Sequence, residues 1–203
     1  ETMPIAREDA LRRGASLENI YFIDDAPQAP MVNGHRVVRY SEFLQIPAAR
    51  HLVVIAIAES KVREKLAAKC ASDNIVSWSV QAENVVVLDD VKIGQGSILS
   101  PFSSLTSNVR IGQYFHANIY SYVAHDCVIG DFVTFAPGVK CNGNVVVEDH
   151  AYIGTGAILK QGQPGRPLVI GQGAVVGMGA VVTKNVAPGE VVVGNPGRPL
   201  NKA

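Results

Sequence analysis

Two ionisable residues, His125 and Asp126, stand side by side in YSYVAHDCVIG, a stretch that is otherwise apolar, small or hydroxylic. A histidine side chain ordinarily has a pKa of about 6.5, so it can accept a proton near neutral pH. A neighbouring carboxylate can orient the imidazole and stabilise the imidazolium ion, as in a catalytic triad. The pair therefore indicates a general base with its carboxylate partner. The alternative is that both side chains lie in a solvent-exposed turn and have no catalytic role. Adjacent side chains point in different directions, so the spacing alone leaves direct contact between them open.

The segment that carries this pair follows a six-residue repeat from about residue 83 onward. Steps of six from Val87 to Leu159 meet thirteen positions, and every one of them is apolar. The residues two places earlier are mostly small or β-branched, with Phe115 as the exception. A β-sandwich would instead show a period of two, with turns every 8 to 12 residues or so. The strict period of six favours a solenoid built from short strands and corners.

Three hexads make a larger period of eighteen residues. KIG, RIG and VIG recur at this spacing from Lys92 to Gly130, VVE at 146–148 keeps the step, and VIG returns 23 residues later at 169–171. The five extra residues must lie in the Pro- and Gly-rich stretch KQGQPGRPLV. A repeat that closes every three hexads predicts a triangular prism with apolar positions inside. Three glycines are expected to supply backbone freedom at its corners: Gly94, Gly112 and Gly130.

The first 82 residues alternate helix and strand patterns and predict a small parallel α/β domain. Helices are expected at 1–14 and 60–74, strands at 19–25 and 51–58, and an extended piece at 32–38. The chain opens on a helix, whereas a parallel sheet of this kind needs a strand before it. We therefore expect a preceding strand in the natural protein.

Composition excludes several classes of partner. The 203 residues are 47% apolar and 18% charged with zero formal net charge, which argues against nucleic acid or anionic lipid as a partner. The longest apolar run, LVVIAIA, is too short to span a bilayer. Three cysteines without CxxC spacing are expected to be free thiols in a cytoplasmic protein: Cys70, Cys127 and Cys141.

The hexads KIGQGS, RIGQYF and VIGDFV resemble those of hexapeptide-repeat acyltransferases, whose fold is a left-handed parallel β-helix. The hand is implied by this resemblance alone, because parallel crossovers are generally right-handed. AHDCVIGDF, APGVKCNGNVVV, IGTGA and GNPGRPL resemble the sialic acid O-acetyltransferase/PglD-type branch, whose members acetylate sugars and amino sugars with acetyl-CoA. FIDD, VNG and VVIAIAESKVREK resemble its N-terminal nucleotide-sugar-binding domain. The expected architecture is a Rossmann-like α/β subdomain at 1–82 followed by a left-handed β-helix at 83–203.

The resemblance implies acyl transfer with His125 as the general base and Asp126 as its partner. Eighteen residues after His125 stands Gly143, which the period places one coil further along the same corner, about 4.8 Å away. The Gly143 N–H is the expected donor to the oxyanion, unless the glycine only makes a turn. Some relatives carry a second histidine where this chain has Thr134, so a supporting role for a second histidine is in doubt.

The same corner column continues to Gln161 and the loop at 161–167, and we expect it to mark a channel for CoA. In the family this channel lies between two β-helices of a homotrimer. Arg198 could also meet CoA phosphates, although it could equally form part of a solvated face. The resemblance and the repeat give these cofactor-binding candidates: Gly143, Gly162, Gly179, Lys184, Asn195 and Pro196.

The sugar nucleotide is expected at Asp24 and Asp25, which end a strand, and at Ser60 and Lys61, which open a helix. A plain turn is the alternative for the aspartates. Ala58 stands where members of the family often have glycine, and this departure weakens the assignment of Ser60 and Lys61 to nucleotide binding. A metal enzyme would need three converging histidines, and His116 lies half a coil from His125, so no metal is expected.

The leading hypothesis is a homotrimeric acetyl-CoA-dependent N-acetyltransferase acting on a nucleotide-linked 4-amino-4,6-dideoxy sugar. O-acetylation of a sialic-acid-like or polysaccharide sugar is the alternative within the class. A non-catalytic trimeric scaffold is the alternative from another class.

Overall fold

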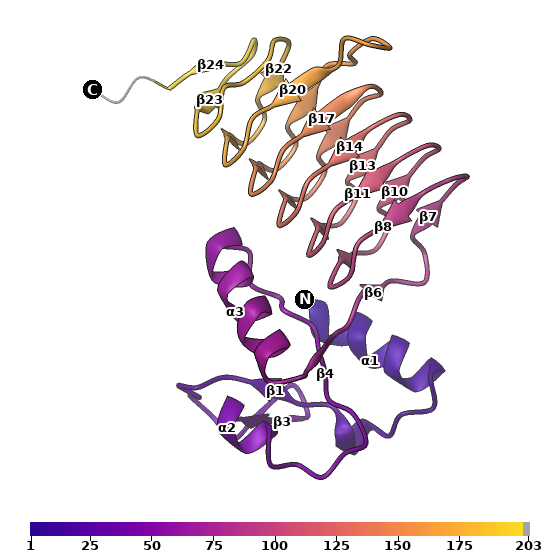
Figure 1. The fold of residues 1–203 in the computed structure, drawn as a ribbon, viewed down its shortest axis with the longest axis vertical. Helices are drawn as coiled ribbons and strands as arrows, with labels where there is room; N and C mark the ends of the chain where they lie inside the picture. Colours follow the sequence, from indigo (N-terminus) through magenta and orange to yellow (C-terminus); the bar gives the residue numbers. More distant parts are fainter. Residues whose placement is uncertain (201–203) are drawn as a thin grey trace.

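A parallel β-helix of triangular cross-section forms the C-terminal part of the chain, and a smaller region of helices and short strands packs against its N-terminal end (Figure 1). The structure is a computed structural model that describes residues 1–200. Strand pairing in the prism begins at Val80 and is parallel, apart from the last strand, which returns antiparallel to its neighbour. The coils wind left-handed, as the family resemblance implies.

Three sheets make the three faces of the prism. The first runs through β7 (Val86–Val87), β10 (Ser104–Leu105), β13 (Tyr122–Val123), β16 (Lys140–Cys141), β19 (Ile158–Leu159) and β22 (Val181–Val182). The second runs through β8 (Lys92–Ile93), β11 (Arg110–Ile111), β14 (Val128–Ile129), β17 (Val145–Val147) and β20 (Leu168–Ile170). The third holds β6 (Val80–Gln81), β9 (Ile98–Leu99), β12 (His116–Ala117), β15 (Thr134–Phe135), β18 (Tyr152–Ile153), β21 (Val175–Val176), β23 (Val191–Val193) and β24 (Arg198–Pro199).

The register confirms the period of eighteen and the position of the insertion. Ile111 pairs with Ile129 and Ile129 with Val147, each eighteen residues on, whereas Val147 pairs with Ile170. The five extra residues lie between Gly162, which bonds to Gly143, and Leu168, where pairing resumes.

The predicted inward positions from Leu99 to Leu159 are all buried and form one core. Val87 and Ile93 are wrong as core positions, since 39% and 37% of their surfaces stay exposed. They lie in the first coils, where no complete coil covers the open end of the prism. Phe115, the exception among the small positions, packs edge to face on Phe135 with ring centroids 5.1 Å apart.

The corners are made differently from the sequence prediction. Gly94, Gly112 and Gly130 do not take the left-handed conformation; instead a Cβ on Gly94 would lie 2.5 Å from the carbonyl of Gly112 in the next coil. The positive-φ residues stand two places later and are mostly not glycine.

We name three columns: the polar corner (Asp90, Asn108, Asp126, Asn144, with His125 beside them), the aromatic corner (Tyr114, Phe132, His150), and the apolar corner (Phe102, Ile119, Tyr120, Met178).

The N-terminal region contains the expected helices and parallel strands in shortened form. Its elements are α1 (Thr2–Arg12), the 3-10 turn η1 (Leu17–Asn19), β1 (Phe22–Ile23), β2 (Met31–Val32), β3 (His35–Val38), α2 (Tyr40–Phe43), β4 (Leu52–Val53), α3 (Ser60–Ser72) and β5 (Val76–Ser77). The strands form two separate sheets, β1-β3-β2 and β4-β5, so the single Rossmann-like sheet we expected is not seen. The sequence prediction also missed α2 and β5.

Within residues 1–200, every helix is too short or too polar to cross a lipid bilayer.

Candidate active site

His125 and Asp126 stand at the polar corner, between strands β13 and β14. Val123 and Ile129 on either side point inward and are each 1% exposed. The two ionisable side chains point outward with 49% and 46% of their surfaces exposed. The prism therefore holds no buried charge at this place, and the pair is accessible to a substrate.

The histidine and the carboxylate are in direct contact, a point that the spacing left open. His125 Nδ1 lies 2.8 Å from Asp126 Oδ2. The contact is possible because Asp126 has a φ of +58°, which turns its side chain back toward its neighbour. An ionised carboxylate can only accept, so Nδ1 donates and Nε2 is left free to take a proton.

Asn108, one coil before Asp126, holds the other carboxylate oxygen. Its Nδ2 donates to Asp126 Oδ1 over 3.1 Å. The hydrogen bond from His125, followed by that from Asn108, keeps the pKa of the Asp126 carboxyl below its ordinary value. The carboxylate therefore stays charged and available to orient the imidazole. The sequence prediction did not include Asn108, although its distance of eighteen residues could have revealed it.

Gly143 lies on the next coil directly against the imidazole. The N–H of Asn144 donates to the His125 carbonyl over 3.0 Å, which fixes the register of the two turns. A Cβ on Gly143 would come 2.5 Å from Cε1 and Nε2 of His125. No backbone carbonyl of residues 1–200 accepts a hydrogen bond from the Gly143 N–H. A free N–H beside a base is the arrangement that an oxyanion donor needs.

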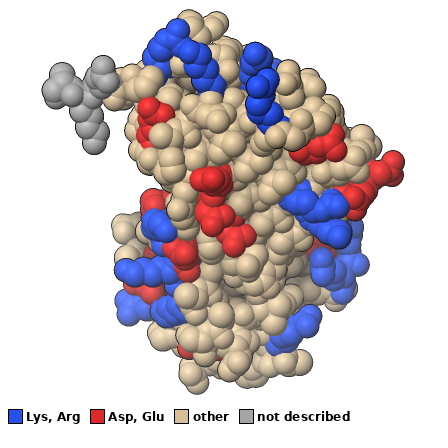
Figure 2. Space-filling model, turned by 45° about the horizontal axis from the view of Figure 1, so that its top comes forward, with Lys and Arg blue, Asp and Glu red and all other residues tan. Residues whose placement is uncertain are grey.

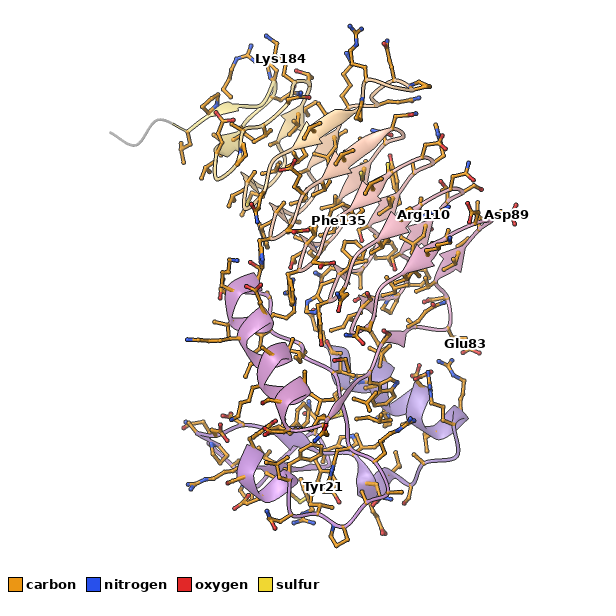
Figure 3. All side chains as sticks on the ribbon, in the orientation of Figure 1. Tyr21, Glu83, Asp89, Arg110, Phe135 and Lys184 are labelled. Carbon is orange, nitrogen blue, oxygen red and sulfur yellow. The ribbon has the colours of Figure 1, made fainter. Side chains whose placement is uncertain are left out.

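The column above Gly143 extends toward the C-terminal end as the period predicts. Gly162 N–H donates to the Gly143 carbonyl over 3.0 Å, and the pairing of Leu159 with Val182 brings Gln161 level with Lys184. Lys184 is thus three coils from His125, about 14 Å along the axis at the usual strand spacing. Figure 3 shows Lys184 at the C-terminal end of the prism.

The remaining cofactor candidates lie away from this column. Gly179 has a φ of +67° and bonds to the carbonyl of Thr155 at the apolar corner. The turn with Asn195 and Pro196 lies beside β22, since Gly197 donates to the carbonyl of Val181 over 2.7 Å. Within one chain these residues do not meet His125.

The predicted sugar-nucleotide residues have partners of their own. Asp24 Oδ1 accepts from the N–H of Ala26 over 2.9 Å, and Asp25 Oδ1 accepts from the N–H of Tyr40 over 2.8 Å at the start of α2. Asp24 therefore stabilises a turn, as in the alternative interpretation, and Asp25 bonds to the N-terminal end of α2. Both residues are exposed, and their contact with a nucleotide stays a prediction.

Ser60 and Lys61 open α3 and lie close to the prism. Lys61 Nζ lies 2.9 Å from His150 Nε2 at the aromatic corner and 3.2 Å from Glu64 Oε2. This end of α3 is therefore in contact with the β-helix through Lys61.

A buried cation that the sequence did not reveal joins the two regions. Arg63 is 0% exposed and donates to the carbonyls of Ile57 and Phe132 and to Oγ1 of Thr134, over 2.7, 2.6 and 3.0 Å. Burial lowers the pKa of Arg63 to about 10, so it stays charged at neutral pH. Thr134 is thus part of the contact between α3 and the prism.

No cluster of three or more His, Cys, Asp or Glu side chains in residues 1–200 is arranged to hold a metal ion.

A histidine paired with a carboxylate beside a free backbone N–H, on a left-handed β-helix, is the arrangement expected of one class, the acyltransferases of this fold. No family model matches the chain. It is 47% identical, over its whole length and 92% of the relative's, to a GDP-perosamine N-acetyltransferase of Escherichia coli O157:H7. The chain belongs to the hexapeptide-repeat sugar acetyltransferases, enzymes that use acetyl-CoA.

Solved structures agree with this assignment over nearly the whole chain. WeeI from Acinetobacter baumannii AYE is 57% identical with a TM-score of 0.95, covering 98% of this chain and 93% of that one. The acetyltransferase domain of PglB from Neisseria gonorrhoeae FA1090, in complex with acetyl-CoA, is 26% identical with a TM-score of 0.85, covering 97% and 93%.

Proposed function

We propose that this enzyme transfers the acetyl group of acetyl-CoA to the amino group of a nucleotide-linked 4-amino-4,6-dideoxy sugar. The observation that carries the proposal is the identity of 47% along the whole chain with a GDP-perosamine N-acetyltransferase. GDP-perosamine is therefore the first acceptor to test. The His125–Asp126 pair and the adjacent Gly143 N–H supply the chemistry that such a transfer needs.

In this proposal the sugar amine attacks the thioester carbon while His125 Nε2 takes its proton. Asp126 orients the imidazole and stabilises the imidazolium ion. The Gly143 N–H donates to the carbonyl oxygen as negative charge develops there. The carbon–sulfur bond then breaks, and the CoA thiolate leaves and can be protonated by the imidazolium.

The proposed CoA channel follows the polar corner from His125 toward the C-terminal coils. Between residues 160 and 200 the chain has one acidic residue, Glu190, and four exposed basic residues: Lys160, Arg166, Lys184 and Arg198. Figure 2 shows Lys and Arg side chains at this end of the molecule. A local excess of positive charge suits the phosphates of CoA. Gly162, one coil beyond Gly143, is a proposed cofactor contact through its position in this column.

The active unit in this proposal is a homotrimer with CoA held between subunits. Gly179, Asn195 and Pro196 are cofactor candidates that do not meet His125 within one chain, so a channel that uses both sets needs two chains. The apolar corner offers a surface for that contact, with Phe102 and Tyr120 stacked 4.9 Å apart. Four of its side chains are largely exposed: Phe102 53%, Ile119 42%, Tyr120 62% and Met178 81%.

The nucleotide part of the acceptor is proposed to contact the N-terminal region at Asp24, Asp25, Ser60 and Lys61. Lys61 is the strongest of the four, because its ammonium group is exposed and can meet a phosphate. We also propose a cytoplasmic enzyme, since its three cysteines are free thiols.

The test is a free-thiol assay with acetyl-CoA and a panel of acceptors, run on full-length protein. GDP-perosamine and other nucleotide 4-amino sugars should release CoA, whereas hydroxyl acceptors such as sialic acids should not. Turnover with hydroxyl acceptors alone would overturn N-acetylation, and no turnover with any acceptor would favour the scaffold. Light scattering of the same sample, beside a Tyr120→Asp variant, tests the trimer.

A further inference from the structure

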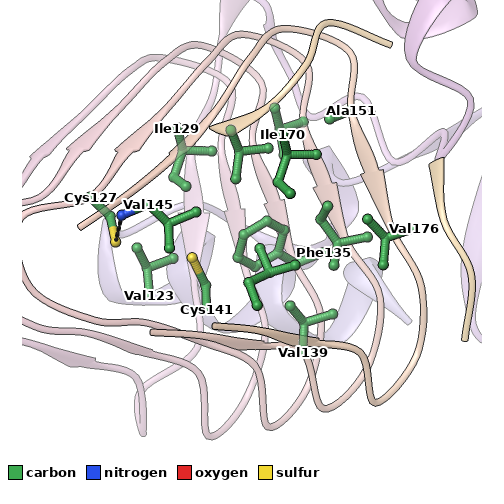
Figure 4. Packing of buried hydrophobic residues seen from close by; sticks show 14 of the residues in the cluster. Val123, Cys127, Ile129, Phe135, Val139, Cys141, Val145, Ala151, Ile170 and Val176 are labelled. Atoms are coloured by element: carbon green, nitrogen blue, oxygen red, sulfur yellow. Dashed lines mark hydrogen bonds between the residues drawn. The ribbon is translucent and has the colours of Figure 1, made fainter. Parts of the chain in front are cut away.

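Cys127 is a buried thiol directly inside the corner that carries the proposed base. It follows His125 by two residues, is 0% exposed and lies in the prism core (Figure 4). The strand pairings stack it between Val109 one coil before and Val145 one coil after. The repeat therefore accepts valine at this position, and packing alone gives no reason for a thiol here.

The thiol contacts the backbone of both turns that build the site. Cys127 Sγ donates to the carbonyl of Asn142 over 3.2 Å and accepts from the N–H of Val145 over 3.4 Å. The carbonyl of His125 lies 3.6 Å from the same sulfur. Figure 4 shows the bond to Val145 and the sulfur turned into the core.

The bond to Asn142 determines where the neighbouring N–H points. Asn142 C=O and Gly143 N–H belong to one peptide unit, and in a planar trans unit these two groups point in opposite directions. Because the carbonyl is directed inward to Cys127, the Gly143 N–H is directed outward, on the side of the His125 ring. A rotation of this unit would turn the donor away from the reacting carbonyl.

The side chain of Asn142 is held as well, on the outer surface. Tyr122 Oη donates to Asn142 Oδ1 over 2.9 Å, and Asn142 Nδ2 donates to the carbonyl of Leu159 over 2.8 Å. These bonds fix the residue from outside. Inside the prism Cys127 holds its carbonyl at 3.2 Å, and the Cys141 thiol contacts the same oxygen at the longer distance of 3.9 Å.

We propose that Cys127 is a positioning residue that holds the Asn142–Gly143 peptide so that the Gly143 N–H faces the acetyl thioester. The inference rests on the proposed function, in which this N–H stabilises the oxyanion. Cys127 touches neither substrate nor cofactor and acts through the peptide alone.

The first test is kinetic and uses Cys127→Val, because valine fits the column at positions 109 and 145. We expect kcat to fall about tenfold, less than the loss of a whole oxyanion donor, with KM values for acetyl-CoA and acceptor within about twofold. Cys127→Ser keeps a donor and should recover a large part of kcat. Val109→Ala opens a cavity one coil away, and it should lower the melting temperature while kcat is kept.

The second test measures the Gly143 amide by NMR and needs no sugar acceptor. In protein labelled with [15N]glycine, the Gly143 amide resonance should move in Cys127→Val and return toward its place in Cys127→Ser. A Cys127→Val enzyme with wild-type kcat, or an unmoved Gly143 resonance, would overturn the inference. An inactive wild type would instead count against the proposed function, and the amide measurement would still decide the role of Cys127.

Discussion

The polar corner and the aromatic corner have the same backbone and opposite surroundings. Asp126 and Phe132 have φ values of +58° and +59°, yet the first stands in solvent and the second lies under α3. At the aromatic corner Tyr114, Phe132 and His150 stack in parallel, with centroids 5.0 and 5.3 Å apart. At the polar corner the same column is built from hydrogen bonds between Asn108, Asp126 and His125.

The repeat therefore fixes where a corner residue stands, and the residue type decides what the corner does. Side chains at one corner recur in every coil. The stacked rings of the aromatic corner form a surface on which α3 packs, and the stacked polar groups of the polar corner form the candidate active site. Substitutions at the polar corner should change turnover with little effect on folding. Substitutions at the aromatic corner should change folding first.

The largest effect is expected for His125→Ala at the polar corner. Removing the base should lower kcat about 10³-fold, within the usual range for general base catalysis. The melting temperature should stay within a few degrees, because the side chain is half exposed and, within residues 1–200, bonds only to Asp126. Added imidazole should restore part of the rate. A variant with more than a tenth of wild-type turnover would assign the base to another group.

At the aromatic corner the largest effect is expected for Arg63→Met. Methionine keeps the apolar stem but leaves the carbonyls of Ile57 and Phe132 without their donor. We expect the free energy of unfolding to fall by about 3 kcal/mol, measured in urea through the fluorescence of Trp78. Lys65→Met, an exposed change on the same helix, is the matched control. Equal stability of the two variants would show that Arg63 does not join the regions.

The prism could be predicted from the sequence because its signal is periodic. Each hexad repeats the same inward position, so thirteen positions support one another, and only Val87 and Ile93 were misplaced. The N-terminal region has no such repetition. Its strands are two to four residues long, and their division into two sheets depends on contacts that no local pattern encodes.

Within the site, the eighteen-residue period predicted which residues stack from one coil to the next. It could not predict hydrogen bonds between neighbouring residues of the same coil. It placed Gly143 and Gln161 in the column of His125, and Asn108 lay within its reach, whereas the place of Lys184 came from the pairing of Leu159 with Val182. The contact between His125 and Asp126 depends on the positive φ of Asp126, which no pattern in the sequence predicts. Arg63 reads as an ordinary surface residue of a helix, and only the packing of α3 on the prism buries it.

Gly143→Ala tests the close contact between two coils of the polar corner. A Cβ would come 2.5 Å from the His125 ring, so the imidazole must turn away. We expect kcat to fall about 30-fold, since small misplacements of a catalytic group are costly. Gly143 is not among the positive-φ residues, so folding should be unchanged. Gly162→Ala, whose Cβ would clash with the Asn144 carbonyl and the Leu168 backbone nitrogen, should destabilise the fold instead, and the reverse pattern would contradict this prediction.

A pH effect on folding is expected beneath the aromatic corner. Burial, helped by the charge of Arg63, lowers the pKa of His116 to about 3. Between this value and the unfolded value of about 6.5 only the unfolded chain binds the proton, so stability present above pH 6.5 is lost as pH falls. The loss from this group approaches about 1.4 kcal/mol per pH unit. Urea midpoints from pH 7 to 4 should fall less steeply in His116→Gln, and parallel slopes would refute the assignment.

The smallest effect is expected for Asn108→Ala, one coil before the base. Asp126 keeps its bond to His125 and loses the one that holds its second oxygen, so the imidazole is oriented less well. We expect kcat to fall about threefold with KM unchanged, as for the loss of one exposed hydrogen bond. Asn108 also has a φ of +61°, so Asn108→Gly is the matched control for backbone strain. If the glycine variant is as impaired as the alanine variant, the side chain is responsible; if it is fully active, the polar corner needs only the turn at this coil.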